Sequence, residues 1–223
     1  MTINEIIDTH PLGKKQISII ILCGFLMVFD GFDVQAMSYA APSILEQWGI
    51  DKVVLGPVFS AGLLGLMLGS LVLSVFSDRF GRRPILIIST FAFSVFMLLT
   101  PLIQDIRYLI LMRFLAGFGL GAIMPNAMAL CGEITPKQRK VSIMMWISCG
   151  FTLGAVLGGL FAYLVIPYLG WQSVFYFGGI IPLLISVIMI FKLPESPQYL
   201  QISGQSFEKN QTIFKLFFST YFF

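Results

Sequence analysis

The amino-acid sequence predicts an all-α membrane protein, a bundle of six transmembrane helices. Of its 223 residues, 57% are hydrophobic and only 11% are charged, and the mean hydropathy is +0.89. These values lie outside the range of ordinary soluble domains. A membrane core of about 30 Å takes about 20 apolar residues per helix, so this length allows six crossings joined by short loops. A second, soluble domain is not expected.

Long apolar runs bounded by charged residues place the six helices in order along the chain. Their expected bounds are 17–41, 55–76, 84–104, 108–131, 141–165 and 173–191. Prolines at or near expected helix ends are Pro42, Pro57, Pro84, Pro136 and Pro167. Three further prolines fall inside expected helices and predict kinks there: Pro101, Pro125 and Pro182.

The chain is therefore divided into a cytoplasmic N-terminus at 1–16, a transmembrane bundle at 17–191 and a cytoplasmic tail at 192–223. Lys14 and Lys15 before an apolar run resemble the start of a secretory signal. Five more apolar helices follow, so we expect no cleaved signal. The end of the tail is rich in Phe but too short to cross a membrane. It is either interfacial or the beginning of something that is absent.

Basic residues are distributed unequally between the two ends of the expected helices. Eleven lie on the side that carries the termini: Lys14, Lys15, Arg79, Arg82, Arg83, Lys137, Arg139, Lys140, Lys192, Lys209 and Lys215. Lys52 and Arg107 lie on the other side. Since Lys and Arg are enriched in cytoplasmic loops, we expect both termini in the cytoplasm of a multi-pass protein of the inner (plasma) membrane.

The sequence lacks the residues that several classes of function require. His10 is the only histidine, and the odd set of Cys23, Cys131 and Cys149 lies in apolar stretches. These residues predict neither a metal or haem site nor a disulfide. The sequence also has no basic face for nucleic acid and no pairing of nucleophile and base. We expect neither an enzyme nor a cofactor.

Two carboxylates, Asp30 and Asp33, fall within the first expected helix and share nearly one face of it. An ionised Asp at the centre of a membrane helix costs about 2.5–3.5 kcal/mol, so such a pair needs a partner, a proton or a function. The simple alternative is that the helix ends before them. Otherwise, a carboxylate in an aqueous cavity that takes and releases a proton suits coupling to a proton gradient.

Arg113 is the other charged residue inside an expected helix. A buried guanidinium must be met by a carboxylate, a carbonyl or an anionic ligand. The candidates are Asp30, Asp33 and the carboxylate of a substrate. The alternative is that the side chain reaches outward to the nearby membrane surface.

Two cytoplasmic links carry charges that suit a gate. The link after the second helix contains Asp78, Arg79, Gly81, Arg82 and Arg83, and the link after the fourth contains Glu133 and Arg139. Salt bridges between the two links would hold one gate state closed and release it in the other. Anchoring to anionic lipid headgroups is the alternative.

These residues resemble the major facilitator superfamily. The segment Asp78-Arg79-Phe80-Gly81-Arg82-Arg83 matches its loop signature G-x-x-x-D-R-x-G-R-R, with Ser74 in place of the first Gly. Arg113 with Gly117, Gly119 and Gly121 resembles the helix-four motif. Glu133, Pro136 and Arg139 resemble the following loop, and Pro194 to Leu200 resembles the segment after helix six. The resemblance covers about residues 13–203 and implies the N-terminal half of such a transporter.

The first helix separates families within this superfamily. Asp30-Gly31-Phe32-Asp33 is similar to the D-G-x-D segment of the aromatic acid:H+ symporter family. Ala155, where drug/proton antiporters typically carry Pro, also favours symport. The resemblance implies proton-coupled uptake of aromatic carboxylates such as benzoate or 4-hydroxybenzoate across a bacterial inner membrane. We expect Phe29, Phe32 and Trp146 to line the cavity near Arg113.

Alternative functions remain open at this point. Members of the family carry six further helices, so a missing C-terminal half or a second copy of the chain is an expected partner. A truncated half-transporter that does not transport is one alternative. A porter of sugars or other organic anions from the same superfamily is another.

Overall fold

A computed structural model describes residues 8, 12–196 and 199. Within them, six helical segments are long and apolar enough to cross a membrane. Their helices are α2 (Lys14–Trp48), α3 (Gly56–Phe80), α4 (Arg82–Leu99), α5 (Ile106–Gly121), α6 (Ile123–Ile134), α7 (Lys137–Leu169) and α8 (Gln172–Lys192). The short 3₁₀ helices η1 (Lys52–Leu55) and η2 (Thr100–Leu102) extend the second and third segments. The prediction of a six-helix membrane bundle is confirmed.

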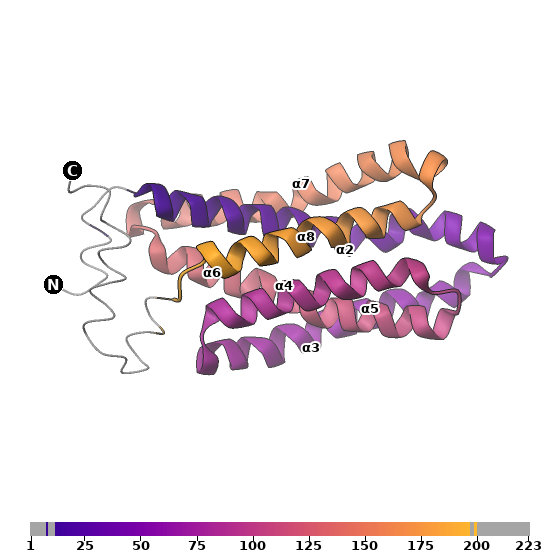
Figure 1. The fold of residues 1–223 in the computed structure, drawn as a ribbon, viewed down its shortest axis with the longest axis horizontal. Helices are drawn as coiled ribbons and strands as arrows, with labels where there is room; N and C mark the ends of the chain where they lie inside the picture. The colour runs from indigo at the N-terminus through magenta and orange to yellow at the C-terminus, as the bar shows by residue number, and fades with distance from the viewer. Residues whose placement is uncertain (1–7, 9–11, 197–198, 200–223) are drawn as a thin grey trace.

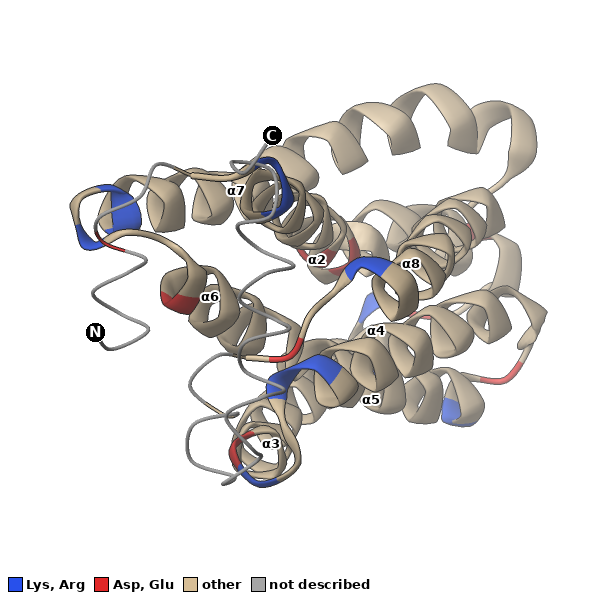
Figure 2. Ribbon diagram, turned by 60° about the vertical axis from the view of Figure 1, so that its left-hand side comes forward, with Lys and Arg blue, Asp and Glu red and all other residues tan. Residues whose placement is uncertain are grey.

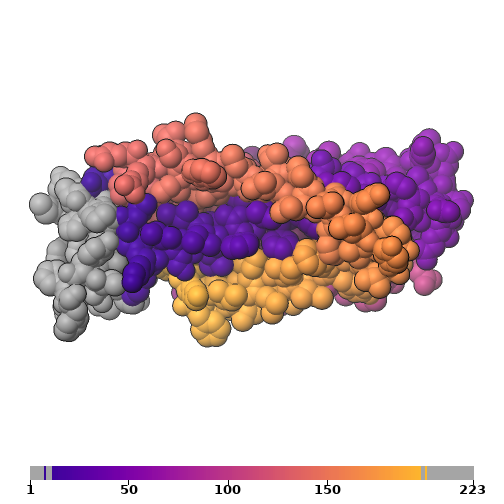
Figure 3. Space-filling view, turned by 90° about the horizontal axis from the view of Figure 1, so that it is seen from above, coloured from indigo at the N-terminus to yellow at the C-terminus, as the bar shows by residue number. Residues whose placement is uncertain are grey.

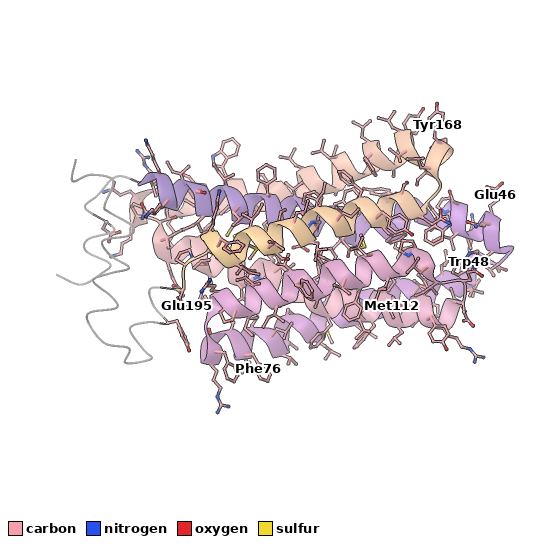
Figure 4. All side chains as sticks on the ribbon, viewed as in Figure 1. Glu46, Trp48, Phe76, Met112, Tyr168 and Glu195 are labelled. Atoms are coloured by element: carbon pink, nitrogen blue, oxygen red, sulfur yellow. The ribbon has the colours of Figure 1, made fainter. Side chains whose placement is uncertain are left out.

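The helices run side by side along one long axis (Figure 1). The bundle begins and ends at the same end, where α2 starts and α8 finishes. Figure 2 shows basic residues at that end, where α2, α4 and α7 begin. At the opposite end, Trp171 Nε1 donates a hydrogen bond to Gln47 Oε1 over 2.7 Å, and this contact ties α8 to α2. Glu46, Trp48 and Tyr168 mark this end in Figure 4, whereas Glu195 and Phe76 lie towards the other.

Two helices differ from the sequence expectation in a way that shapes the site. The first membrane helix, α2, does not end at Pro42 but continues to Trp48. Gly49 follows it in the left-handed conformation (φ 62°) that glycine favours, and this ends the helix. Asp30 and Asp33 therefore lie inside a helix, and the alternative that the helix ends before them is wrong. The fourth is interrupted at Ala122, whose carbonyl accepts a hydrogen bond from Asn126 Nδ2 over 2.8 Å.

Glycines bring two pairs of helices into backbone contact. A methyl group at Gly65 or Gly69 on α3 would overlap the carbonyl groups of Phe114 or Phe118 on α5. One at Gly154 on α7 would overlap the carbonyl of Val28 on α2. Figure 3 shows α7 lying along α2. Small residues allow such close approach in membranes, where lipid removes most of the hydrophobic drive for helix association.

Asp8 caps the beginning of α7. Asp8 Oδ1 accepts a hydrogen bond from the backbone N–H of Lys137 over 2.9 Å, and Asp8 Oδ2 lies 3.2 Å from Lys137 Nζ. The backbone hydrogen bond first, and then the ammonium, hold the pKa of the Asp8 carboxyl below its usual range. A carboxylate at a helix N-terminus is favoured by the helix dipole.

This cap predicts a pH dependence at the start of α7. Because the pKa of Asp8 is lowered by folding, the contact is fully present above the ordinary Asp pKa of about 3.9 and is lost as pH falls through the lowered value. Hydrogen exchange of the first turn of α7 is expected to accelerate in that acid range. Asp8→Asn should abolish the acid step, and an acid step that persists in Asp8→Asn would contradict this role.

Candidate functional site

The two intramembrane charges of opposite sign meet in the structure. Arg113 Nη1 on α5 lies 3.3 Å from Asp33 Oδ1 on α2, and the two side chains are 5% and 6% exposed. The residues are far apart in the chain, and the packing of α2, α5 and α8 brings them together. The alternative that Arg113 reaches outward to the membrane surface is therefore wrong.

Three other elements hold the guanidinium in place. Arg113 Nη2 donates to Thr100 Oγ1 over 3.1 Å and to Met97 Sδ over 3.2 Å. The ring centroid of Phe175 lies 4.9 Å from Arg113 Cζ, a cation–π contact. Arg113 Nε is buried and has no hydrogen-bond partner in the described part of the chain. The pair thus leaves one donor of the guanidinium unused.

Sequence reasoning did not identify Met97, Thr100 or Phe175. A threonine beside Pro101 is only weak evidence for a functional site, because the hydroxyl group of a threonine in a membrane helix commonly donates a hydrogen bond to a backbone carbonyl of the same helix. Thr100 does donate to the carbonyl of Phe96 over 2.8 Å. Phe175 is one of 22 phenylalanines, and nothing in the sequence singles it out.

Asp30 lies close to this pair on α2. Its side chain is 4% exposed, and Asp33 is the charged neighbour with which it interacts electrostatically. The structure gives the Asp30 carboxyl no hydrogen bond from another described residue. Asp30 and Asp33 therefore share one buried region, and Asp33 alone has a cationic partner there.

A cavity of about 260 Å³ opens beside the ion pair, between α2, α3 and α5. Asp33 and Arg113 line one part of it, and the remaining polar lining residues are Gln35 and Ser38. The rest of the wall is mainly apolar: Val34, Met37, Val58, Phe59, Gly62, Leu63, Leu66, Gly117 and Leu120. An apolar wall with one cationic group suits an organic anion that has an apolar body.

The aromatic residues expected in this cavity lie elsewhere. Phe29 and Phe32 belong to an aromatic cluster with Phe161 of α7 and Phe177 of α8, in which the last two rings stack at 4.2 Å. Neither residue lines the cavity beside Asp33. Trp146 is 78% exposed on α7 and is also absent from the cavity wall. The sequence showed where Phe32 lies along the helix, but not which neighbouring helix covers its ring.

A second charged cluster joins the start of α4 to the end of α6, in the two links that the sequence analysis expected to carry a gate. Arg82 Nη1 lies 3.0 Å from Glu133 Oε1, and Ser196 Oγ donates to Glu133 Oε2. The backbone N–H of Arg83 donates to Glu195 Oε1 over 3.1 Å, and Arg83 Nη2 donates to the carbonyl of Ile190 over 2.6 Å. The cluster therefore connects α4, α6 and the segment after α8.

The predicted members of this gate are only partly brought together. Gly81 (φ 101°) makes the turn between α3 and α4 against the Glu195 carboxylate, and a side chain there would be strained. Asp78, Arg79 and Arg139 are exposed. Arg79 lies over the ring of Phe80 at 5.7 Å. Glu195 and Ser196, which were not predicted as site residues, complete the cluster.

Among the residues that the structure describes, no three His, Cys, Asp or Glu side chains gather as a metal site. The part of the 192–223 tail at 197–198 and 200–223 lies outside the described residues, as does most of 1–16. Predictions for those segments remain predictions.

Comparisons with known proteins agree with the arrangement of the helices. The family model for the Major Facilitator Superfamily matches residues 23–223. The 4-hydroxybenzoate transporter PcaK of Pseudomonas aeruginosa is 38% identical over 209 residues, which cover 94% of this chain and 47% of that protein. A gallate transporter of Pseudomonas putida is 36% identical over 89% of this chain and 44% of its own length. The chain thus spans about half the length of the curated relatives that it matches.

The solved structures show the fold alone. The xylose transporter XylE from E. coli, in a partially occluded inward open conformation, superposes with a TM-score of 0.81 at 18% identity. The match covers 91% of this chain and 55% of that one. A bacterial homolog of the human lysosomal transporter Spinster superposes with a TM-score of 0.74 at 16% identity, over 82% of this chain and 44% of that one.

Proposed function

Because the chain belongs to the major facilitator superfamily, we propose that it serves proton-coupled uptake, or symport, of aromatic carboxylates such as 4-hydroxybenzoate or benzoate. The observation that carries this proposal is the buried pair of Asp33 and Arg113 at the wall of an apolar cavity. Relatives over most of this chain are named as transporters of 4-hydroxybenzoate, gallate and benzoate.

The pair offers a way to couple a proton to an anion. When Asp33 binds a proton, its attraction for Arg113 falls, and the guanidinium becomes available to a substrate carboxylate. Loss of the proton restores the pair and releases the substrate. Protonation outside thus favours substrate binding, and deprotonation inside favours substrate dissociation. The fully loaded carrier and the empty carrier therefore change between the outward- and inward-facing states more readily than a carrier that holds the proton or the substrate alone. Asp30 is a second proton acceptor beside this pair.

We place the protein in a bacterial inner membrane with the basic end of the bundle in the cytoplasm. The helices α2, α4 and α7 begin at that end with Lys14, Arg82 and Lys137, whereas Lys52 begins η1 and Arg107 lies in the first turn of α5 at the other end. Such an asymmetry follows the positive-inside rule. Labelling of a cysteine introduced at Lys52 with an impermeant maleimide, in intact spheroplasts, tests this orientation.

The charged cluster of Arg82, Glu133 and Ser196 serves as a cytoplasmic gate contact. Glu133→Gln should weaken it, because an amide cannot replace the ionic hydrogen bond to Arg82. We expect alkylation of Cys131, which is buried on α6, to accelerate about tenfold, the change given by roughly 1.4 kcal/mol. The rate is measured with a maleimide in a Cys23→Ala, Cys149→Ser background, in which Cys131 is the remaining cysteine.

Asp78→Asn is the matched control for this prediction. It makes the same carboxylate-to-amide change on an exposed residue outside the cluster. Alkylation of Cys131 at equal rates in the Glu133→Gln and Asp78→Asn variants would contradict the gating role.

Transport by this bundle is proposed to need a second six-helix unit, either a further half or a second copy. Large apolar side chains are exposed along α3 and α7, among them Leu63, Leu71, Leu153 and Leu160. Light scattering of the detergent-solubilised chain separates a monomer from a dimer.

The direct test is uptake of labelled 4-hydroxybenzoate and benzoate by cells that express the chain, with an immunoblot for membrane insertion. Accumulation that an uncoupler abolishes is the expected result where light scattering shows that two copies of the chain supply both six-helix units. A well-inserted chain that accumulates neither acid would contradict the proposal that these 223 residues transport.

A further inference from the structure

The cavity beside Arg113 has a second polar region that the ion pair does not use. Gln35 and Ser38 line it from α2, and both residues are exposed. Neither side chain makes a hydrogen bond to another residue of the described chain. Their amide and hydroxyl groups are therefore available to a ligand in the cavity. Both groups donate and accept hydrogen bonds.

The separation of the two polar regions along the axis of α2 is similar to the length of an aromatic acid. Asp33 and Ser38 are five positions apart on one helix, which corresponds to a rise of about 7.5 Å. This rise is comparable to the span from a carboxyl group across a benzene ring to a para hydroxyl group. Arg113 lies at the level of Asp33, because the two side chains are in contact.

The other direction from Arg113 is apolar. Leu66, Gly117 and Leu120 form that part of the wall. A ring hydroxyl placed there would lose its hydrogen bonds to water without gaining others, which is costly. A hydroxylated acid is therefore expected to point its hydroxyl group towards Ser38, with its ring against Val58 and Phe59.

We propose that Ser38, assisted by Gln35, binds a hydroxyl substituent on the ring of the aromatic acid. The site then selects hydroxy-substituted acids over unsubstituted benzoate. This inference rests on the proposed function, because it assumes that Arg113 receives the carboxylate. A site that hydrogen-bonds a substrate hydroxyl discriminates against the analogue that lacks it, since its own polar groups are left unpaired.

Equilibrium dialysis with radiolabelled 4-hydroxybenzoate and benzoate, using the purified chain in lipid nanodiscs, tests the inference. The wild-type chain should bind 4-hydroxybenzoate more tightly. Ser38→Ala should weaken its binding about two- to tenfold, the value of one neutral hydrogen bond, and leave benzoate unchanged. Gln35→Met, which keeps the length of the side chain, should act in the same direction.

Ser70→Ala is the matched control, because Ser70 lies on α3 outside the cavity wall and its hydroxyl donates to the carbonyl of Met67. Equal weakening of both acids by Ser38→Ala, or no change for either, would overturn the inference and leave the proposed function standing. Binding of neither acid by a folded wild-type chain would overturn both. Circular dichroism verifies that each variant is folded.

Discussion

Asp33→Asn is expected to abolish uncoupler-sensitive accumulation of 4-hydroxybenzoate. Asparagine has nearly the shape of aspartate, and its amide oxygen still accepts a hydrogen bond from Arg113. It cannot take up or release a proton, so the proton gradient no longer drives accumulation of the substrate. Accumulation should fall to the level of cells treated with an uncoupler. The measurement is the ratio of internal to external labelled acid at steady state.

A second measurement separates loss of coupling from loss of binding. Exchange of internal for external substrate needs no net proton movement, and asparagine resembles the protonated, substrate-accepting form of Asp33. Exchange in membrane vesicles should therefore persist in Asp33→Asn while accumulation is lost. Asp105→Asn is a matched control, because Asp105 is exposed and caps α5, a role that asparagine fulfils equally well. Undiminished accumulation in Asp33→Asn would remove Asp33 from the coupling mechanism.

Gly154→Val is expected to prevent α7 from packing on α2. Even a single methyl group at Gly154 would overlap the backbone carbonyl of Val28, and a backbone cannot move aside as a flexible side chain can. Forcing extra atoms into a packed core typically costs 1–3 kcal/mol, and we expect at least about 3 kcal/mol here because the obstruction is backbone. The measurement is the thermal unfolding midpoint of the purified chain in detergent, followed by circular dichroism.

Gly24→Ala provides the matched control on α2. A methyl group at Gly24 meets nothing within 4 Å, so this substitution should be neutral or should stabilise the helix by up to about 1 kcal/mol. Comparing it with Gly154→Ala separates the effect of lost helix packing from the intrinsic preference of alanine for helices. Equal unfolding midpoints for Gly154→Ala and Gly24→Ala would contradict close backbone contact between α2 and α7.

Helix ends and interruptions depended on interactions that the sequence pattern does not contain. Pro42 lies within α2, which continues past the proline to Trp48. The last turn of this helix contains Gln47, whose side chain accepts a hydrogen bond from Trp171. The interruption between α5 and α6 falls at Ala122, where the side chain of Asn126 satisfies a carbonyl. Proline predicts that a helix is disturbed, but the surrounding helices decide whether it ends or bends.

The sequence by itself determined the membrane class, the six helices and the residues that are costly to bury. Hydropathy over about 20 residues is a local property, and an intramembrane charge such as Asp33 or Arg113 is visible wherever it lies. Only the tertiary structure decided that these two residues meet, that Phe175 covers the guanidinium and that Phe32 faces an aromatic cluster instead of the cavity. The partners come from separate helices, and glycines such as Gly154 fix how closely helices approach and which side chains face one another. No local pattern records that choice, because many membrane helices carry similar small residues.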